Sequence, residues 1–149
     1  MCIRDSYMIN VQFGQLRNGL TEVSNTGELI PELAESWDSS SDAKTWTFAI
    51  RQGVEFHNGK TLTTEDVVDS INHHLGDDNK SAANGILAGI KSVKADGNNV
   101  VVSLEGGDAD FPFLLSDYHV NICPSKGDGT IDWESGLSLI HISEPTRPY

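Results

Sequence analysis

Histidine and carboxylate side chains are the residues of this 149-residue chain that could do chemistry, because together they could bind a metal ion that activates water. The candidate ligands are His57, His73, His74 and His119, with several Asp and Glu residues. His73 and His74 are adjacent, so they cannot both point at one ion from one face of a helix. We therefore keep a metal-assisted hydrolase as an alternative hypothesis, and we expect no metal, no cofactor and no catalytic residue.

Other catalytic patterns are missing from the sequence. Gly53, Gly59 and Gly76 are isolated turn formers and make no glycine-rich phosphate loop. No serine stands in a nucleophile-elbow motif. Once the N-terminal leader described below is set aside, Cys123 is the only cysteine, which excludes a disulfide framework and a CxxC metal site. We expect Cys123 to be a small buried hydrophobic residue and the protein not to be an enzyme.

The charge balance excludes one class of partner. Ten Lys and Arg residues against 22 Asp and Glu residues give a net charge of −12. Nucleic-acid binding needs clustered basic side chains, so we exclude nucleic-acid partners, and such a surface also repels anionic membranes. No run of about 18 apolar residues is present, so we expect no membrane-spanning segment.

A strand, a tight turn and a capped helix follow one another between Pro31 and Leu75. Residues 45–50 alternate apolar and polar side chains, which is the pattern of a strand with one buried face. Asn58-Gly59 supplies the positive φ angles of a tight turn, and Thr63 stands three residues before Asp66 as in a capping box. Gly76 ends the helix. We expect strand and helix to share one core: Trp46, Phe48, Ile50, Val67, Val68 and Ile71.

The flanking segments complete an α+β arrangement. We expect two hairpins, a helical turn from Pro31 that carries Leu33, Ala34 and Trp37, and a helix over residues 82–90 with Ser81 as its N-cap. The hairpins join residues 20–23 to 28–30 and residues 91–94 to 100–104. Pro112 suits the first turn of a further helix, and residues 118–124 form a final extended segment.

The run LAESW, followed after a gap by TWTFAIRQGVEFHNGKTLTTEDVVDSI, resembles the extracellular solute-binding proteins of family 5, which deliver peptides, nickel and related cargo to ABC importers. Thr64 replaces the Ala that is usual in the family. The resemblance covers roughly residues 19–125. It implies part of the N-terminal lobe of a two-lobed, type II periplasmic-binding-protein-like fold, with a mixed sheet and packed helices. It also makes residues 7–16 the end of a helix.

The same resemblance implies the function. The chain would belong to the substrate-binding component of a bacterial ABC importer, which captures a small solute, with short peptides as the leading cargo, by hinge closure and delivers it to a membrane permease. Its location would be the periplasm, or the cell surface as a lipoprotein, with the export signal outside this fragment. The family places Ser81, Asn84, Tyr118 and His119 on the cleft side, where helix N–H groups and aromatic faces suit a ligand. Alternatively, Ser81 is only a cap and Tyr118 only a core residue.

Both ends of the chain resemble translated sequencing adaptors. Residues 1–5 (MCIRD) are what a library transposon end encodes, and residues 137–147 (LSLIHISEPTR) match its reverse complement with the adjoining adaptor. We therefore expect residues 1–6 and 137–149 to lie outside the fold, and residues 7–136 to be a fragment of the solute-binding lobe. The alternative is that Leu137, Leu139, Ile140 and Ile142 form a terminal strand.

Overall fold

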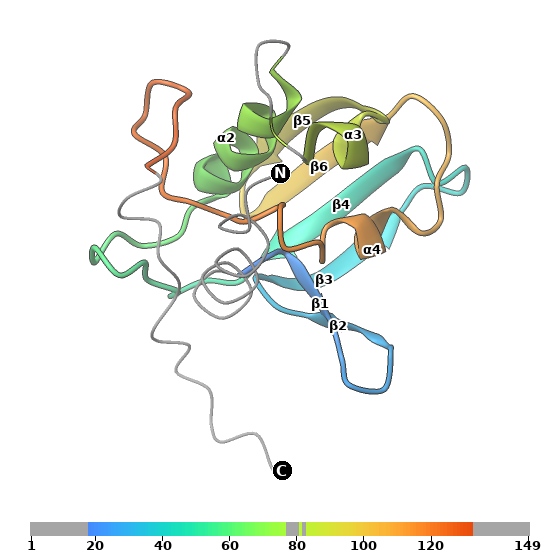
Figure 1. Cartoon of the computed structure of the whole chain (residues 1–149), viewed down its shortest axis with the longest axis horizontal. Coiled ribbons are helices and arrows are strands. Elements are labelled where there is room, and N and C mark those ends of the chain that lie inside the picture. Colours follow the sequence, from blue (N-terminus) through green and yellow to red (C-terminus); the bar gives the residue numbers. More distant parts are fainter. Residues whose placement is uncertain (1–17, 77–80, 82, 133–149) are drawn as a thin grey trace, which may run out of the picture.

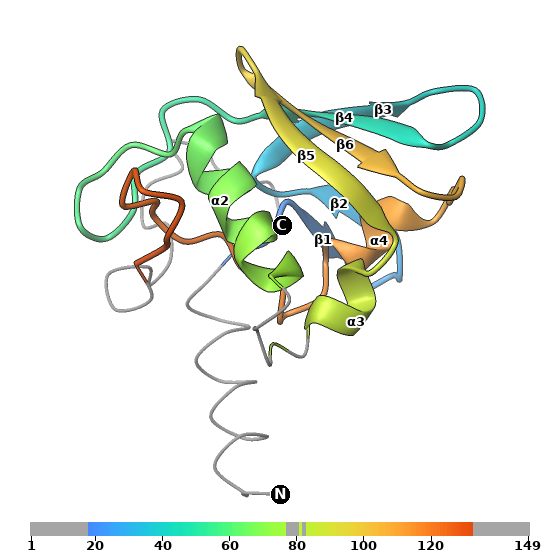
Figure 2. The same cartoon turned by 90° about the horizontal axis from the view of Figure 1, so that it is seen from above.

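The computed structural model describes residues 18–76, 81 and 83–132, which form two antiparallel sheets and a set of helices (Figure 1). The larger sheet has the strand order β3-β4-β6-β5. Its strands are β3 (Ala34–Ser39), β4 (Thr45–Ile50), β5 (Ile90–Asp96) and β6 (Asn99–Leu104). The helices α2 (Thr64–Leu75), α3 (Ala83–Leu87) and α4 (Phe111–Leu114) all lie on one side of this sheet (Figure 2). The α+β fold class is thus confirmed.

The two central strands present their apolar residues to the helices. Phe48 on β4 is opposite Val100 on β6, and Trp46 is opposite Val102. Burial alternates strictly along both strands, as the period-two pattern predicts. Gly97 has φ +60 in the turn between β5 and β6, a conformation that a side chain disfavours. The strand at residues 45–50 and the second hairpin are confirmed.

Helix α2 covers the centre of the sheet. The Thr63 side chain accepts from the Asp66 backbone N–H and the Asp66 side chain accepts from the Thr63 backbone N–H, so the predicted capping box is present. Val67 and Ile71 are fully buried in the same core as Phe48. Val68 is only partly buried at the edge of that core. The helix ends at Gly76 as expected, although its φ of −61 is not left-handed.

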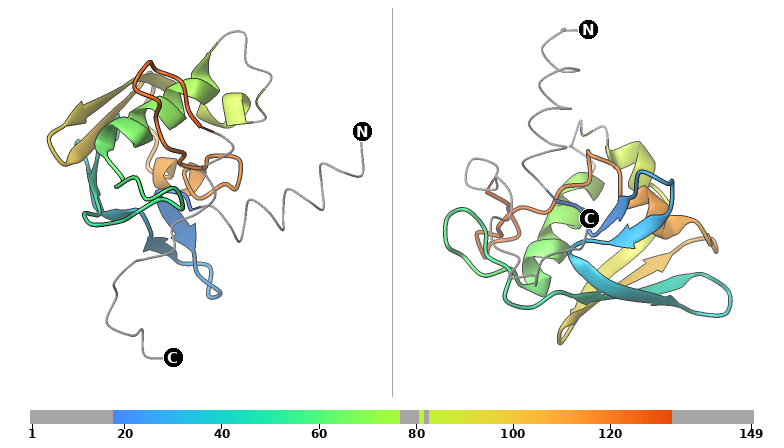
Figure 3. Two further views of the ribbon diagram at one scale, coloured as in Figure 1. Left: turned by 90° about the vertical axis from the view of Figure 1, so that its left-hand side faces the viewer. Right: turned by 90° about the horizontal axis from the view of Figure 1, so that it is seen from below.

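The first predicted hairpin forms a small second sheet. Strands β1 (Thr21–Val23) and β2 (Leu29–Pro31) pair antiparallel, and the hairpin projects beside β3 (Figure 3). Gly27 has φ +83 in the connecting turn. The buried Thr21 hydroxyl donates to the Pro112 carbonyl over 2.7 Å, which joins this hairpin to α4.

The predicted helical turn at residues 31–37 is wrong. Residues 34–39 form β3, in which Trp37 is opposite Phe48 and is partly buried at the edge of the core. Pairing satisfies backbone groups along the whole edge of β4, whereas one helical turn would leave that edge uncovered. Leu33 and Ala34 are nevertheless fully buried, so the sequence identified the inward residues but not their backbone conformation.

Two later boundaries also differ from the sequence prediction. Helix α3 covers residues 83–87 and not 82–90, because Ile90 begins β5 opposite Leu104. The segment expected to be extended begins with a turn that contains Tyr118 and His119, and residues 121–124 pair with no strand. Pro112 does stand in the first turn of α4, as predicted. The expected helix at residues 7–16 and the adaptor-like ends lie outside the described residues.

Candidate functional site

The C-terminal end of α2 connects two of the nominated residues. His74 is only 2% exposed, and its Nδ1 lies 2.7 Å from the Ser81 hydroxyl. The Asn84 side-chain amide donates to the His74 carbonyl over 3.0 Å. Ser81 also accepts the Ala83 backbone N–H over 3.2 Å, where α3 begins. Ser81 and Asn84 therefore fasten the start of α3 to the end of α2.

The other two nominated residues form an aromatic pair in the turn that follows α4. The ring centroids of Tyr118 and His119 are 3.9 Å apart with an interplanar angle of 35°. Asp117 fixes His119, since one carboxylate oxygen lies 2.7 Å from the ring Nδ1 and 2.9 Å from the backbone nitrogen. The Tyr118 side of this pair faces solvent, at 40% exposure, so Tyr118 is not a core residue of the part of the chain that the structure describes.

An electrostatic interaction links His74, which contacts Ser81 and Asn84, to His119, which pairs with Tyr118. The pKa of His74 is lowered from its ordinary 6.5 to about 4, chiefly by burial and further by the charges of His73 and His119. An effect of His119 on His74 means that the turn after α4 lies near the end of α2. Ser81 and Asn84 thus contact His74 directly, His119 acts on it through its charge, and Tyr118 stacks on His119.

This group offers polar contacts and not acid–base catalysis. The distance between Ser81 and His74 is one that a nucleophile and its base would have. A buried imidazole with a pKa of about 4 is a weak base at neutral pH, however, and it is closed to a substrate. The arrangement suits ligand binding through the exposed Tyr118 face and the neighbouring imidazole.

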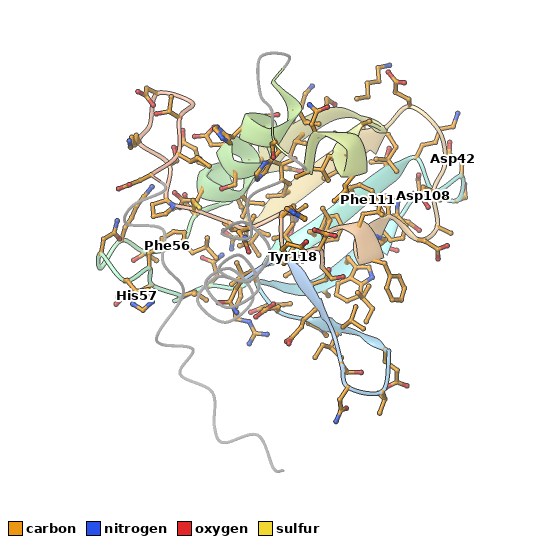
Figure 4. The ribbon with its side chains drawn as sticks, in the orientation of Figure 1. Asp42, Phe56, His57, Asp108, Phe111 and Tyr118 are labelled. Carbon is orange, nitrogen blue, oxygen red and sulfur yellow. The ribbon has the colours of Figure 1, made fainter. Side chains whose placement is uncertain are left out.

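The histidines do not assemble into the metal site considered from the sequence. Residues 18–76, 81 and 83–132 contain no group of three or more His, Cys, Asp or Glu side chains that could hold a metal ion. His57 lies in the turn between β4 and α2, far from Tyr118 (Figure 4). In the same described ranges, no helix is long and apolar enough to cross a bilayer.

A buried polar network positions the chain that follows Tyr118. Asp66 is fully buried and accepts from the Lys60 ammonium over 2.5 Å and from the Ser125 backbone N–H over 2.6 Å. Ser70 exchanges hydrogen bonds with the backbone of Cys123, which is buried as predicted. The capping box identified Asp66 in the sequence, but nothing there indicated its partner Ser125, which lies 59 residues away. Helix α2 thereby holds residues 121–125 in place.

The four-stranded sheet with helices on one face defines an α+β module. The sequence profile described as bacterial extracellular solute-binding proteins, family 5 Middle, matches residues 28–137. The chain belongs to this family, which confirms the resemblance seen in the sequence.

The matches to individual relatives include most of this chain but only a small part of each relative. The HTH-type transcriptional regulator SgrR of Yersinia enterocolitica is 29% identical over 91% of this chain and 22% of its own length. The structure of the PBP AgaA from Agrobacterium tumefaciens R10 with agropinic acid matches with a TM-score of 0.72 and 31% identity, over 78% of this chain and 23% of AgaA. The structure of the oligopeptide-binding protein AppA from Bacillus subtilis, in complex with a nonapeptide, matches with a TM-score of 0.67 and 29% identity, over 73% of this chain and 22% of AppA. The chain thus spans less than a quarter of each.

Proposed function

We propose that residues 7–136 form part of the N-terminal lobe of the substrate-binding component of a bacterial ABC importer. The observation that carries this proposal is the family match over residues 28–137, which includes the four-stranded sheet and α2. In this proposal the lobe supplies one wall of a cleft that closes on a small solute about a hinge. The closed receptor then delivers the solute to the membrane permease.

The family description as extracellular supports a location outside the cytoplasmic membrane. We place the protein in the periplasm or on the cell surface as a lipoprotein. The module would act there without catalysis. SgrR carries a matching segment under the name of a transcriptional regulator. Solute binding and delivery to a permease are therefore two separate parts of the proposal.

Short peptides are the proposed cargo. AppA, whose structure contains a nonapeptide, supports this choice, whereas AgaA is described with agropinic acid and represents a different ligand chemistry among the matches. We assign the ligand contacts to Tyr118 and His119, whose paired rings offer an exposed aromatic face next to a polar imidazole. Ser81 and Asn84 complete the wall through their hydrogen bonds at the end of α2.

Calorimetry with the complete product of the gene that contains this sequence tests the proposal. A library of short peptides should bind, and Tyr118→Ala and Asn84→Ala should weaken binding about tenfold while the melting temperature stays within a few degrees. Phe113→Ala is the matched control, because Phe113 is an aromatic residue of similar exposure, 45%, outside the nominated group. It should keep full affinity.

Two results would count against the proposal in different ways. If both variants bind peptides as well as the parent protein does, the nominated residues are scaffold only. If the parent binds no peptide but does bind opine-like acids, the cargo assignment is wrong while the receptor function stands. Stoichiometric metal in the purified protein, together with hydrolysis of the peptides, would favour the hydrolase alternative.

A further inference from the structure

A pocket separate from the nominated residues lies between α3 and α4. Its volume is about 170 Å³, and the side chains of Ile86, Leu87, Phe111 and Leu114 form apolar walls. For comparison, a cavity of about 150 Å³ lined by such residues is large enough to take up benzene. The pocket is open to solvent on one side, and its volume gives room for one six-membered ring or an aliphatic group of similar size.

The rim of this pocket is acidic. Asp108 is the one charged residue among those that line it within the described part of the chain. The segment 105–110, which supplies Gly106 and Asp108 to the lining, contains three carboxylates, at Glu105, Asp108 and Asp110, and no basic residue. Asp42 lies in the neighbouring loop, which Asp108 contacts through a 3.1 Å hydrogen bond from its backbone N–H to the Ala43 carbonyl (Figure 4).

The carboxylate of Asp42 stays ionised at neutral pH. A hydrogen bond from the Ser40 hydroxyl is the main cause that lowers the pKa of Asp42, and the Lys44 backbone N–H and ammonium lower it further. Lys44 offsets part of this charge locally. The net charge of the whole chain is −12, so the wider field also favours a cation.

The rim is held in position before any ligand arrives. The Trp46 indole donates to the Asp108 carbonyl over 3.1 Å, and the Asp110 backbone N–H donates to Asp108 Oδ1 over 2.9 Å. A backbone hydrogen bond of 3.0 Å from Glu105 to Gly89 joins the two sides of the mouth. A pre-organised site loses less entropy when a ligand binds than one that must be ordered first.

From these observations we infer that the pocket binds a small organic cation, namely a primary ammonium group on a compact apolar body such as an arylalkylamine. The ring lies between Phe111, Ile86 and Leu114, and the ammonium group pairs with the Asp108 carboxylate. An uncharged ring would gain only the apolar contact, and a carboxylate would be repelled. The residues that line this pocket differ from the four assigned to the proposed peptide cleft.

The glycines at the mouth allow a direct test of occupancy. A Cβ added at Gly89 or Gly106 would meet no atom within 4 Å, and neither residue has a positive φ. Gly106→Leu should therefore fill the mouth without straining the backbone. Asp108→Asn removes the charge and keeps an oxygen that can accept the Asp110 N–H.

The experiment is an NMR titration of the isotope-labelled 149-residue chain with 2-phenylethylammonium. Amide signals of residues 86–89 and 105–108 should shift in a saturable way. The neutral 2-phenylethanol should bind about fivefold more weakly, in line with the loss of one partly exposed ion pair, and 3-phenylpropionate should cause no shift. Gly106→Leu should abolish binding, and Asp108→Asn should weaken it about fivefold.

Asp128→Asn is the matched control, because Asp128 Oδ1 likewise accepts a backbone N–H two residues on, from Thr130 over 2.9 Å, but it lies outside the pocket. It should leave the affinity unchanged. The inference is overturned if the parent chain shows no saturable shift with the cation, or if the cation and the carboxylate bind equally well. Since both of those comparisons use the unsubstituted protein, they decide the question even if a variant fails to fold.

Discussion

The buried imidazole of His74 should make the stability of this protein depend on pH. His74 is 2% exposed and its pKa falls to about 4, mainly because burial disfavours the charged form. In the unfolded chain the same side chain should titrate near 6.5. The test is the substitution His74→Asn, which removes the titratable ring and keeps a polar group that can reach the Ser81 hydroxyl.

The sign follows from proton binding in the two states. Between pH 6.5 and about 4 the unfolded chain binds a proton at His74 that the folded chain does not. The free energy of unfolding therefore falls as the pH is lowered through this window, with a limiting slope of about 1 kcal/mol per pH unit. The total loss attributable to His74 is about 3 kcal/mol, and above pH 7 this residue contributes no slope.

Urea unfolding monitored by tryptophan fluorescence at several pH values between 4 and 7.5 measures this slope. The His74→Asn variant should be less stable than the parent by a constant amount at and above pH 7. On acidification to pH 4, its free energy of unfolding should fall by about 3 kcal/mol less than that of the parent. His73→Asn is the control: His73 is more exposed, and its charge is a smaller cause of the His74 pKa shift than burial, so most of the pH slope should remain. The reasoning is refuted if the parent and His74→Asn show the same pH slope.

Two further predictions concern the core and the turns. Phe48→Ala should lower the free energy of unfolding by about 3–5 kcal/mol. Thr47→Ala, on the outward face of the same strand, should lower it by less than about 1 kcal/mol. Equal losses in urea unfolding would contradict the assignment of inward and outward faces on β4. Gly85→Ala and Gly97→Ala both add a methyl group to open space, but Gly97 has φ +60. The first should therefore raise and the second lower the stability by about 1 kcal/mol, and the same sign in both would argue against the turn geometry.

The sequence determined those parts of the fold whose cause lies within a few residues. The alternation at residues 45–50, the Thr63 cap with Asp66 and the hairpin that joins residues 91–94 to 100–104 each depend on near neighbours, and each appears in the structure as predicted. The family motifs lie in the same stretch and led to the correct family. Local patterns of this kind survive folding because tertiary packing requires the same buried faces that they create.

The tertiary structure decided what depends on segments far apart in the chain. Residues 34–39 became a strand because β4 offered an edge to pair with, and Asp66 acquired Ser125 as a partner from 59 residues away. The low pKa of His74 arises only once folding buries its ring and brings His119 near it, and the pocket at Asp108 exists only where α3 meets α4. Residue types and spacing cannot encode these features, because burial and electrostatic interactions are set by distances that chain closure creates.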